Sequence, residues 1–490
     1  MRILKILVLL VPVLNIVAQS RFYKLYSGTG FDRGEDIIEL PDSSFLVAGT
    51  SGSWEDNAQG FLMKLDSLGN YQWSHAYGAE EAEEIKRVFY RPGLGYYLAG
   101  MSSSWNPSNY DPMLIFTDLS GNQQWIKTYE SPDWERINDG VQTLDTGLIL
   151  VGERQPVLGT ASQVLVMRLD KNGDTIWTQS FGTEGADCAN SIIRLSDTTY
   201  AIGGKWFVSD SSATKGFVAL IHEDGQLIWL DTLGHLSGDF EVLDITKNLY
   251  GIQFAGYHLN QTSDYDKFSG SIDLDGIILT QVAPFDGLNS DEIIQQLAYI
   301  AQQDVTILGI QELNDFTFDQ PYDLYFGYGD AYFGYWLTGW PSTTILNQGN
   351  DQVGNICATM DGGFAAVGMN SVIVDGQNQL NGGSNVFVLK LNGDGSAYIQ
   401  TDTVFTTQQL VGLKPIFNGS GIRYFPNPSS HFIHFQWDGN EQKQVSLYDC
   451  QGNIIFYKYL ASDQSIDVSF WSNGLYLLRI DGKSYPIIKN

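Results

Sequence analysis

The sequence predicts an all-β protein: a seven-bladed β-propeller followed by a small Ig-like β-sandwich. Three features predict this fold class, namely a repeat of about 52 residues, a composition rich in aromatic residues and glycine, and a change of composition near residue 405. The chain holds 26 tyrosines, 26 phenylalanines, 12 tryptophans and 52 glycines but 14 prolines, which suits short strands joined by tight turns. With 43% hydrophobic and 17% charged residues, it has the composition of a core-forming chain.

Residues 1–18 are predicted to form a signal peptide. Arg2 and Lys5 give a positive start, residues 6–14 are apolar, and Ala18 precedes the expected cleavage before Gln19. The alternative is a membrane anchor, but the apolar run is too short to cross about 30 Å of hydrocarbon as a helix. No later segment has 18 uninterrupted apolar residues, so we expect no transmembrane span in the mature protein.

The repeat is defined by two landmarks. Four tryptophans stand 52 residues apart, and each follows a glycine by four residues; they are Trp73, Trp125, Trp177 and Trp229. An aspartate precedes that glycine by three residues in the first three copies, and His222 replaces it in the fourth. The second landmark is a short apolar segment ending in glycine, which occurs at Gly49, Gly100, Gly152, Gly204, Gly256, Gly309 and Gly368. Seven copies therefore lie between residues 22 and 405.

Each copy has room for four short strands, and no copy has a convincing helical period. The first copy is expected to form strands at 36–40, up to Gly49, at 61–65, and around Trp73. Such a unit repeated seven times predicts a propeller, with a solenoid as the alternative. Residues 22–26 match the strand around Trp73, so they can pair with the last copy and close the ring. Residues 398–406 could fill the same place, and the sequence leaves both open.

The repeat resembles a family of bacterial and archaeal propeller repeats. The segment Asp361-Gly362-Gly363-Phe364 and the segment from Lys64-Leu65-Asp66 to Trp73 match that family's pattern. The sixth copy departs from the pattern most, because it lacks the turn aspartate and is crowded with aromatic residues over 326–340. The resemblance implies the fold of residues 19–405 and leaves the function open, since propellers host many activities.

The C-terminal part is predicted to be a separate domain at 422–490, joined by a linker at 406–421. Its strands alternate apolar and polar residues between turns at 438–440 and 451–453. Residues 421–490 carry six basic and six acidic side chains. The net charge of −29 therefore belongs to the preceding residues.

This domain resembles the type A C-terminal sorting domain of the type IX secretion system of Bacteroidota. The resemblance rests on five motifs in order, whose marker residues are Pro426, Asn427, Pro428, Gly474, Tyr476 and Lys489. It implies the type IX machinery as partner, and a protein that is secreted or held on the outer-membrane surface. The alternative is an adhesive Ig-like module without a sorting role.

The best candidate for a site is a set of acids, one before each landmark glycine. The set is Asp32, Glu80, Asp133, Asp187, Asp239, Asp291 and Asp351. One interpretation is structural, because short acidic side chains cap turn N–H groups. The other is a ring that faces a ligand or Ca²⁺ at the mouth of the channel, since seven carboxylates close together would otherwise repel one another. We assign no metal ligands and no other cofactor.

The aromatic block at 322–340 is a second candidate, because exposed aromatic side chains stack on sugars or contact protein surfaces. Its candidate binding residues are Tyr328, Trp336 and Trp340, and packing is the alternative. No phosphate loop, metal-binding histidine motif or nucleophile elbow occurs. The three cysteines are far apart in sequence and are expected to be free thiols.

These observations favour a secreted or cell-surface propeller that binds a glycan or a protein without catalysis. The net charge of −29 argues against nucleic acid as a partner. One alternative is an extracellular enzyme that degrades polysaccharide with acids at the propeller mouth. Another is a purely structural surface protein. The sequence names no ligand and does not settle whether the protein is an enzyme.

Overall fold

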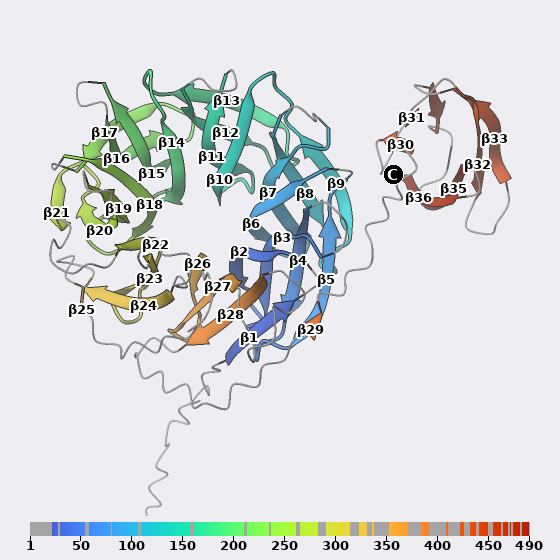
Figure 1. The fold of residues 1–490 in the computed structure, drawn as a ribbon. Coiled ribbons are helices and arrows are strands. Elements are labelled where there is room, and N and C mark those ends of the chain that lie inside the picture. Colours follow the sequence, from blue (N-terminus) through green and yellow to red (C-terminus); the bar gives the residue numbers. More distant parts are fainter. Residues whose placement is uncertain are drawn as a thin grey trace, which may run out of the picture.

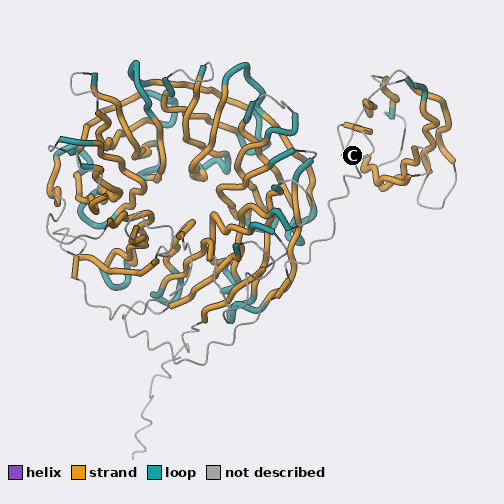
Figure 2. The backbone as a smooth tube through the Cα atoms, viewed as in Figure 1, coloured by secondary structure: helices purple, strands orange, loops and turns teal. Residues whose placement is uncertain are grey.

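The computed structural model describes most of the chain between residues 22 and 489. The described residues are 22–27, 30–53, 58–79, 81–105, 109–156, 161–209, 213–234, 237–260, 265–282, 291–313, 323–330, 336–337, 352–370, 384–391, 408–409, 422–425, 432–437, 441–448, 454–461, 464–468, 471, 474–480 and 483–489. These residues form strands, turns and loops, with no helix among them (Figure 2). The predicted signal peptide lies outside the described residues.

Strands β1 to β29 form seven sheets, antiparallel except where β29 joins β1, and we number the sheets by their inner strands. Sheet 1 contains β2 (Asp32–Glu39), β3 (Phe45–Ser51), β4 (Gln59–Leu65) and β5 (Tyr71–Tyr77). Sheet 2 contains β6 (Glu83–Arg91), β7 (Gly95–Ser102), β8 (Asp111–Thr117) and β9 (Gln123–Thr128). Sheet 3 contains β10 (Trp134–Gln142), β11 (Leu148–Gln155), β12 (Gln163–Leu169) and β13 (Thr175–Phe181).

The remaining sheets repeat this order. Sheet 4 contains β14 (Cys188–Arg194), β15 (Thr199–Val208), β16 (Ala213–His222) and β17 (Leu227–Leu233). Sheet 5 contains β18 (Asp239–Lys247), β19 (Ile252–Leu259), β20 (Tyr265–Ile272) and β21 (Ile278–Val282). Sheet 6 contains β22 (Asp291–Ile300), β23 (Val305–Leu313), β24 (Asp323–Asp330) and β25 (Trp336–Leu337). Sheet 7 contains β26 (Gln352–Ala358), β27 (Phe364–Asn370), β28 (Asn385–Leu391), β1 (Phe22–Ser27) and β29 (Gln408–Gln409).

The sheets stand in a ring around a common axis, as in a β-propeller (Figure 1). Neighbouring sheets contact each other in sequence order, and β2 of sheet 1 contacts β26 and β27 of sheet 7. The N-terminal strand β1 pairs antiparallel with β28, with Tyr23 opposite Leu389. The alternative closing segment, 398–406, lies outside the described residues. Gln408 and Gln409, which the sequence places in the linker, form β29 and pair in parallel with β1.

Every inner strand carries a β-bulge at the same level. The register shifts at Glu35, Lys86, Asn138, Asn190, Leu243, Gln295 and Gly354. In six sheets a landmark glycine pairs with the residue before the bulge, as Gly100 pairs with Ile85. In the sixth sheet Ile310 holds that position and Gly309 lies one residue earlier. The predicted equivalence of Gly309 with the other landmark glycines is therefore one residue out of register.

The turn between the third and fourth strands follows the Asp-x-x-Gly pattern. Asp66 Oδ1 accepts hydrogen bonds from the N–H groups of Leu68 and Asn70 at 2.9 and 2.8 Å. Gly69 adopts a φ of +72°, the left-handed conformation that favours glycine. The ring of Phe22 lies against Gly69, just as the ring of Trp73 lies against Gly121 of the next sheet. The tryptophan position thus packs one sheet onto the next, including across the ring closure.

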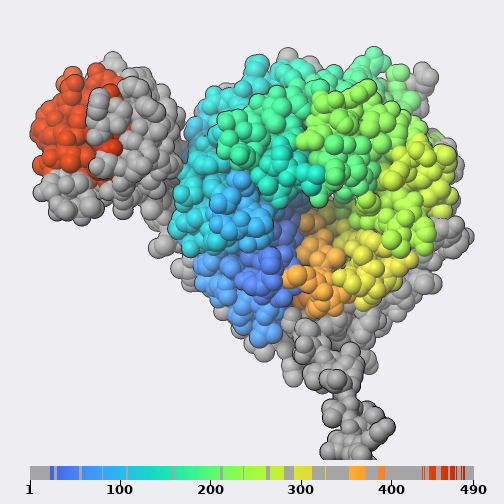
Figure 3. All heavy atoms as spheres, turned by 180° about the vertical axis from the view of Figure 1, so that it is seen from behind, coloured from blue at the N-terminus to red at the C-terminus, as the bar shows by residue number. Residues whose placement is uncertain are grey.

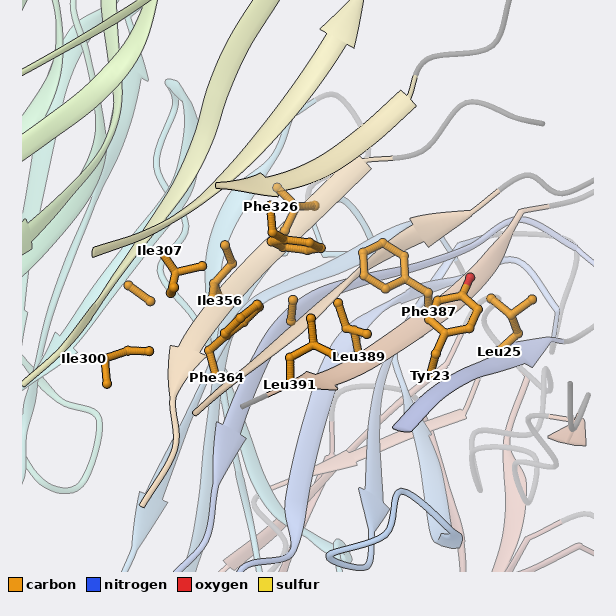
Figure 4. Close-up of a cluster of buried hydrophobic side chains, with 13 residues drawn as sticks. Tyr23, Leu25, Ile300, Ile307, Phe326, Ile356, Phe364, Phe387, Leu389 and Leu391 are labelled. Carbon is orange, nitrogen blue, oxygen red and sulfur yellow. The ribbon is translucent and has the colours of Figure 1, made fainter. Parts of the chain in front are cut away.

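The hydrophobic core is divided between neighbouring sheets. One cluster joins β1 and sheet 7 to sheet 6, with Phe326 and Phe364 in ring contact at 5.5 Å between centroids (Figure 4). The strands contribute their alternate apolar residues to clusters on both faces, so β3 and β7 are buried along their whole length. This is the reason that the second strand of each repeat is a continuous apolar run.

The C-terminal strands form two sheets with one shared core. The strands are β30 (Ile422–Phe425), β31 (Phe432–Trp437), β32 (Lys443–Tyr448), β33 (Ile454–Leu460), β34 (Gln464–Asp467), β35 (Gly474–Ile480) and β36 (Lys483–Lys489). The sheet orders are β30-β31-β34 and β33-β32-β35-β36. Ile433, Phe435, Leu447 and Leu478 are buried in their common core.

Candidate functional site

Four of the predicted acids make polar contacts with neighbouring strands and loops, and they are Asp32, Asp133, Asp187 and Asp239. Asp32 is fully buried and accepts hydrogen bonds from the hydroxyl groups of Ser51 and Ser53. Asp187 accepts from the N–H groups of Thr183 and Phe207. These are contacts of the kind that the capping interpretation expects.

Two further acids of the set make similar contacts. Asp133 forms an ion pair with Arg154. Asp239 accepts hydrogen bonds from the N–H and the hydroxyl of Thr214, at 2.7 and 3.1 Å. Arg154 lies in β11 of sheet 3, the sheet that Asp133 leads into, whereas Thr214 lies in β16 of sheet 4 and holds Asp239 of the next sheet.

The strand register places different acids at the position of Asp32 in three sheets. Asp32 lies two residues before the residue that precedes the bulge. In sheets 2, 3 and 6 that position holds Glu83, Glu135 and Glu292 rather than Glu80, Asp133 and Asp291. Glu83 accepts hydrogen bonds from the hydroxyls of Ser102 and Ser104, the same pattern as Asp32. A fixed distance of 17 residues before the landmark glycine would have identified Glu83 and Glu135 from the sequence.

Several of the predicted site and motif residues lie outside the described residues or are described only by their place in a strand. Glu80, Asp351 and Trp340 lie outside the described residues, as do Pro426, Asn427 and Pro428. Asp291, Tyr328, Trp336, Gly474 and Lys489 are described as positions in strands. Phe326 of the aromatic block is buried in the core, and Tyr476 is buried in the C-terminal core.

A cavity of about 220 Å³ lies on the axis of the ring, where the seven inner strands meet. Figure 3 shows the surface hollowed at the centre of the ring. The lining residues come from all seven inner strands and include most of the bulge residues; they are Arg33, Glu35, Lys86, Arg87, Asn138, Asn190, Leu243, Gln295, Gln296, Val353 and Gly354. Sequence reasoning missed this site because the side chains at the bulges share no residue type.

One wall of the cavity is charged. Lys86 Nζ lies 2.9 Å from Glu35 Oε1, and Arg33 Nε lies 3.2 Å from the same oxygen. Burial raises the pKa of Glu35, but Lys86, Arg33 and Arg87 together hold it below its ordinary value. Glu35 is therefore an anion among three cations. Next to this wall in the ring, β22 and β26 contribute Gln295, Gln296 and Gly354 to the lining.

Hydrogen bonds just behind the bulges connect every neighbouring pair of sheets, and we call them the axial belt. Asp139 accepts from Arg87 Nε of sheet 2 at 2.5 Å and from the N–H of Ile192 of sheet 4 at 2.8 Å. Asp36 likewise accepts from Asn355 of sheet 7 and from Val88 N of sheet 2.

The third belt aspartate bridges the next sheets, and a glutamine completes the circle. Asp244 accepts from Ser191 Oγ and Leu297 N, each at 2.7 Å. Gln295 Oε1 accepts from Val353 N at 3.1 Å and joins sheet 6 to sheet 7. A ring of seven cannot alternate donors and acceptors throughout, so an amide, which offers both, is suited to the odd position.

The belt aspartates sit in an environment that penalises charge. Burial raises the pKa of Asp36, although Arg87 and Val88 N act in the opposite direction. Burial also raises the pKa of Asp244 to about 6. Burial lowers the pKa of Arg87, whereas the adjacent carboxylates of Asp139 and Asp36 raise it. The net effect is a rise in the pKa, so the guanidinium stays charged.

The lining of the cavity is rich in hydrogen-bonding side chains. Guanidinium, ammonium, carboxylate and amide groups can donate to and accept from hydroxyl and carbonyl groups of a polar ligand. Across the part of the chain that the structure describes, no group of three His, Cys, Asp or Glu side chains is arranged to hold a metal ion. Cys188 and Cys357 are free thiols, and burial raises the pKa of each above its ordinary value.

Comparison with known families identifies the C-terminal part. Residues 423–490 match the family described as "Secretion system C-terminal sorting domain". The chain therefore carries a sorting domain of the type IX secretion system, which indicates export to the cell surface or the extracellular space. A search of curated proteins finds no match.

Two solved structures are reported among those similar to this chain. PorZ, a surface component of the type IX secretion system of Porphyromonas gingivalis, is 10% identical with a TM-score of 0.41, over 95% of this chain and 60% of that chain. This chain thus spans 60% of the length of PorZ. The propeller domain of the Trilobed protease of Pyrococcus furiosus is 10% identical with a TM-score of 0.44, over 78% of this chain and 100% of that chain.

Within the described ranges, no helix has the length and apolar character needed to cross a bilayer.

Proposed function

We propose that the seven sheets are the blades of one closed propeller, and that this propeller is a non-catalytic binding protein. The signal peptide and the C-terminal domain, an Ig-like sandwich, deliver it to the cell surface or the medium. Its ligand is a polar one, a glycan or a protein segment. The ligand binds in the axial cavity.

The observation that supports this proposal most is the polar lining of the cavity by all seven inner strands. Arg33 is the most accessible of the three lining cations, because its side chain is 34% exposed against 14% for Lys86 and 13% for Arg87. A hydrogen bond from a charged donor contributes about 1.5–3 kcal/mol. Losing one should weaken binding by roughly tenfold or more.

The test is a glycan array and a turnover screen with the purified full chain, with and without Ca²⁺. We expect binding to one class of glycan without product formation. Arg33→Gln should weaken that binding about tenfold. Arg194→Gln is the matched control, because Arg194 is exposed at the end of β14 and does not line the cavity.

Three outcomes would contradict the proposal. Product formation would favour the polysaccharide-degrading alternative. Binding that Arg33→Gln leaves unchanged would move the site away from the axis, and the aromatic residues Tyr328, Trp336 and Trp340 would then be the next to substitute. A Ca²⁺ requirement that is lost in Asp32→Asn would favour the ligand-facing interpretation of the acids over capping.

A further inference from the structure

A group of exposed apolar side chains lies where sheet 4 meets sheet 5, and we call it the rim patch. Its side chains are 40–72% exposed; they are Leu227, Ile228, Leu249, Tyr250, Leu274, Ile277, Ile278 and Leu279. Sheets 4 and 5 are neighbours in the ring (Figure 1). Eight half-exposed large side chains expose on the order of several hundred Å² of apolar surface, as much as the largest patch expected on a monomer.

The patch is continuous across the boundary between the two sheets. Trp229, which follows Leu227 and Ile228, donates from Nε1 to the carbonyl of Leu274 at 3.2 Å. The ring of Trp229 also lies against Gly276, which precedes Ile277. Gly251, which follows Leu249 and Tyr250, lies close to Asp273 in the same turn.

Ile277 occupies the position after the turn glycine, where sheets 1 and 2 have an asparagine that hydrogen-bonds to the turn aspartate. In sheets 1 and 2, Asn70 and Asn122 follow the turn glycine, and their Nδ2 groups donate to Asp66 and Asp118 at 2.8 and 2.9 Å. Ile277 cannot make that bond, and its side chain is 62% exposed. The sequence gives up a local hydrogen bond and gains no burial, which is the mark of a functional position.

The next two positions show the same contrast. Sheet 2 has Gln123 and Gln124 where sheet 5 has Ile278 and Leu279. Ile278 and Leu279 are both more than 40% exposed. They lie on the outer strand of the sheet, and exposed apolar residues on an edge strand favour association with another chain. The packing of the blade does not require them, because the glutamines serve in sheet 2.

The charges around the patch select the partner. Asp224, Asp231, Asp273 and Asp275 lie on the same turns and strands, and the basic residue Lys247 ends β18 and donates to the carbonyl of Leu195. Asp224 has a side chain that is 64% exposed. A second copy of this chain, with a net charge of −29, would be repelled, whereas a cationic partner would be attracted.

We propose that the rim patch binds a basic amphipathic segment of another protein, with apolar side chains on the patch and lysine or arginine side chains on the flanking aspartates. This surface is separate from the axial cavity. It stands or falls independently of the proposed ligand of that cavity.

The test uses a nine-residue peptide of alternating leucine and lysine as the probe, with the full chain in solution. The variant Leu249→Ser/Ile277→Asn removes the two most exposed side chains, and Ile277→Asn restores the amide found in sheets 1 and 2. The matched control is Leu94→Ser/Leu144→Ser, which changes two 56%-exposed leucines in turns outside the patch. We expect the variant to bind the probe at least tenfold more weakly than the wild type, and the control to bind it equally.

Two comparison peptides and one physical measurement make the test decisive. A leucine–glutamate peptide and a serine–lysine peptide should each bind at least tenfold more weakly than the probe. Equal binding of either peptide, or equal loss of probe binding in the control variant, would overturn the proposal. Self-association of the wild type in analytical ultracentrifugation, lost in the variant, would also overturn it by making a second copy the occupant.

Discussion

At the scale of single residues, the structure explains why the landmark glycines recur. Gly100 pairs with Ile85 just before the bulge of β6, and a Cβ at Gly100 would overlap the carbonyl oxygen of Glu84. The bulge pushes that carbonyl toward the neighbouring strand, so there is room for a hydrogen atom and not for a methyl group. The repeat of glycine along the chain is therefore a consequence of the repeat of bulges around the axis.

Gly100→Ala should lower the free energy of unfolding by about 2–4 kcal/mol, because backbone rather than a flexible side chain must move. Gly52→Ala is the control, since its nearest neighbours would be 3.5 Å from the new Cβ. Urea denaturation of the two variants checks the prediction. Equal stability of the two would show that the bulge can relax.

The buried carboxyl group of Asp244 should make the free energy of unfolding depend on pH. Its ordinary pKa is 3.8 and burial raises the pKa to about 6 in the folded state, so the folded chain holds the proton more tightly than the unfolded chain. Stability from this group is greatest below pH 4 and is lost as the pH rises through 6. Relative to Asp244→Asn, the wild type should lose up to about 3 kcal/mol between pH 4 and pH 7. Parallel pH profiles of the two proteins in urea denaturation would contradict the shift.

At the scale of elements, β1 takes the place of the fourth strand in sheet 7 and contacts the next sheet as the other fourth strands do. Tyr26 of β1 donates its hydroxyl hydrogen bond to the carbonyl of Gly69 at 2.5 Å. Tyr77 and Tyr129 make the same bond to Gly121 and Gly173, at 2.6 and 2.7 Å. Repetition of one contact at three boundaries means that the closure uses the same chemistry as the rest of the ring.

Tyr26→Phe, Tyr77→Phe and Tyr129→Phe should therefore each lower the free energy of unfolding by about 1–2 kcal/mol, the cost of leaving a carbonyl without its partner. Thermal or urea denaturation of the three variants makes the comparison. If Tyr26→Phe costs nothing while the other two cost the expected amount, β1 is not the strand that closes the ring in solution.

At the scale of the whole molecule, the chain consists of an acidic ring of sheets followed by a sorting domain with no net charge. The axial belt joins each sheet to the next, so the ring should unfold as one unit rather than sheet by sheet. The C-terminal strands have their own core.

Deletion of residues 423–490 should abolish export of the chain and leave the rest folded inside the cell envelope. Cell fractionation with an antibody to the propeller checks this outcome. Deletion of 454–460 alone, which removes one edge strand, provides the comparison for a domain that is damaged rather than absent. Export of the 423–490 deletion at the wild-type level would show that the domain is not the sorting signal.

Sequence periodicity determined much of this protein. The 52-residue spacing of tryptophans and landmark glycines fixed four strands per repeat, because a strand buried on both faces must be a continuous apolar run and a tight turn must carry Asp or Gly. The match of 22–26 to the strand around Trp73 made this segment one of two candidates for closing the ring, and the structure pairs it with β28. The sorting motifs likewise identified the last domain, since they are local in the chain.

Only the tertiary structure decided where the functional groups meet. The cavity joins side chains as different as Glu35, Asn190 and Leu243, which share a bulge and not a residue type. The acids chosen by approximate spacing turned out to differ from those in register, because Glu83 rather than Glu80 occupies the place of Asp32. Hydrogen bonds between sheets join residues far apart in the chain, as Arg87 and Asp139 are 52 residues apart. A period along the chain carries no information about which side chains face one another across an axis.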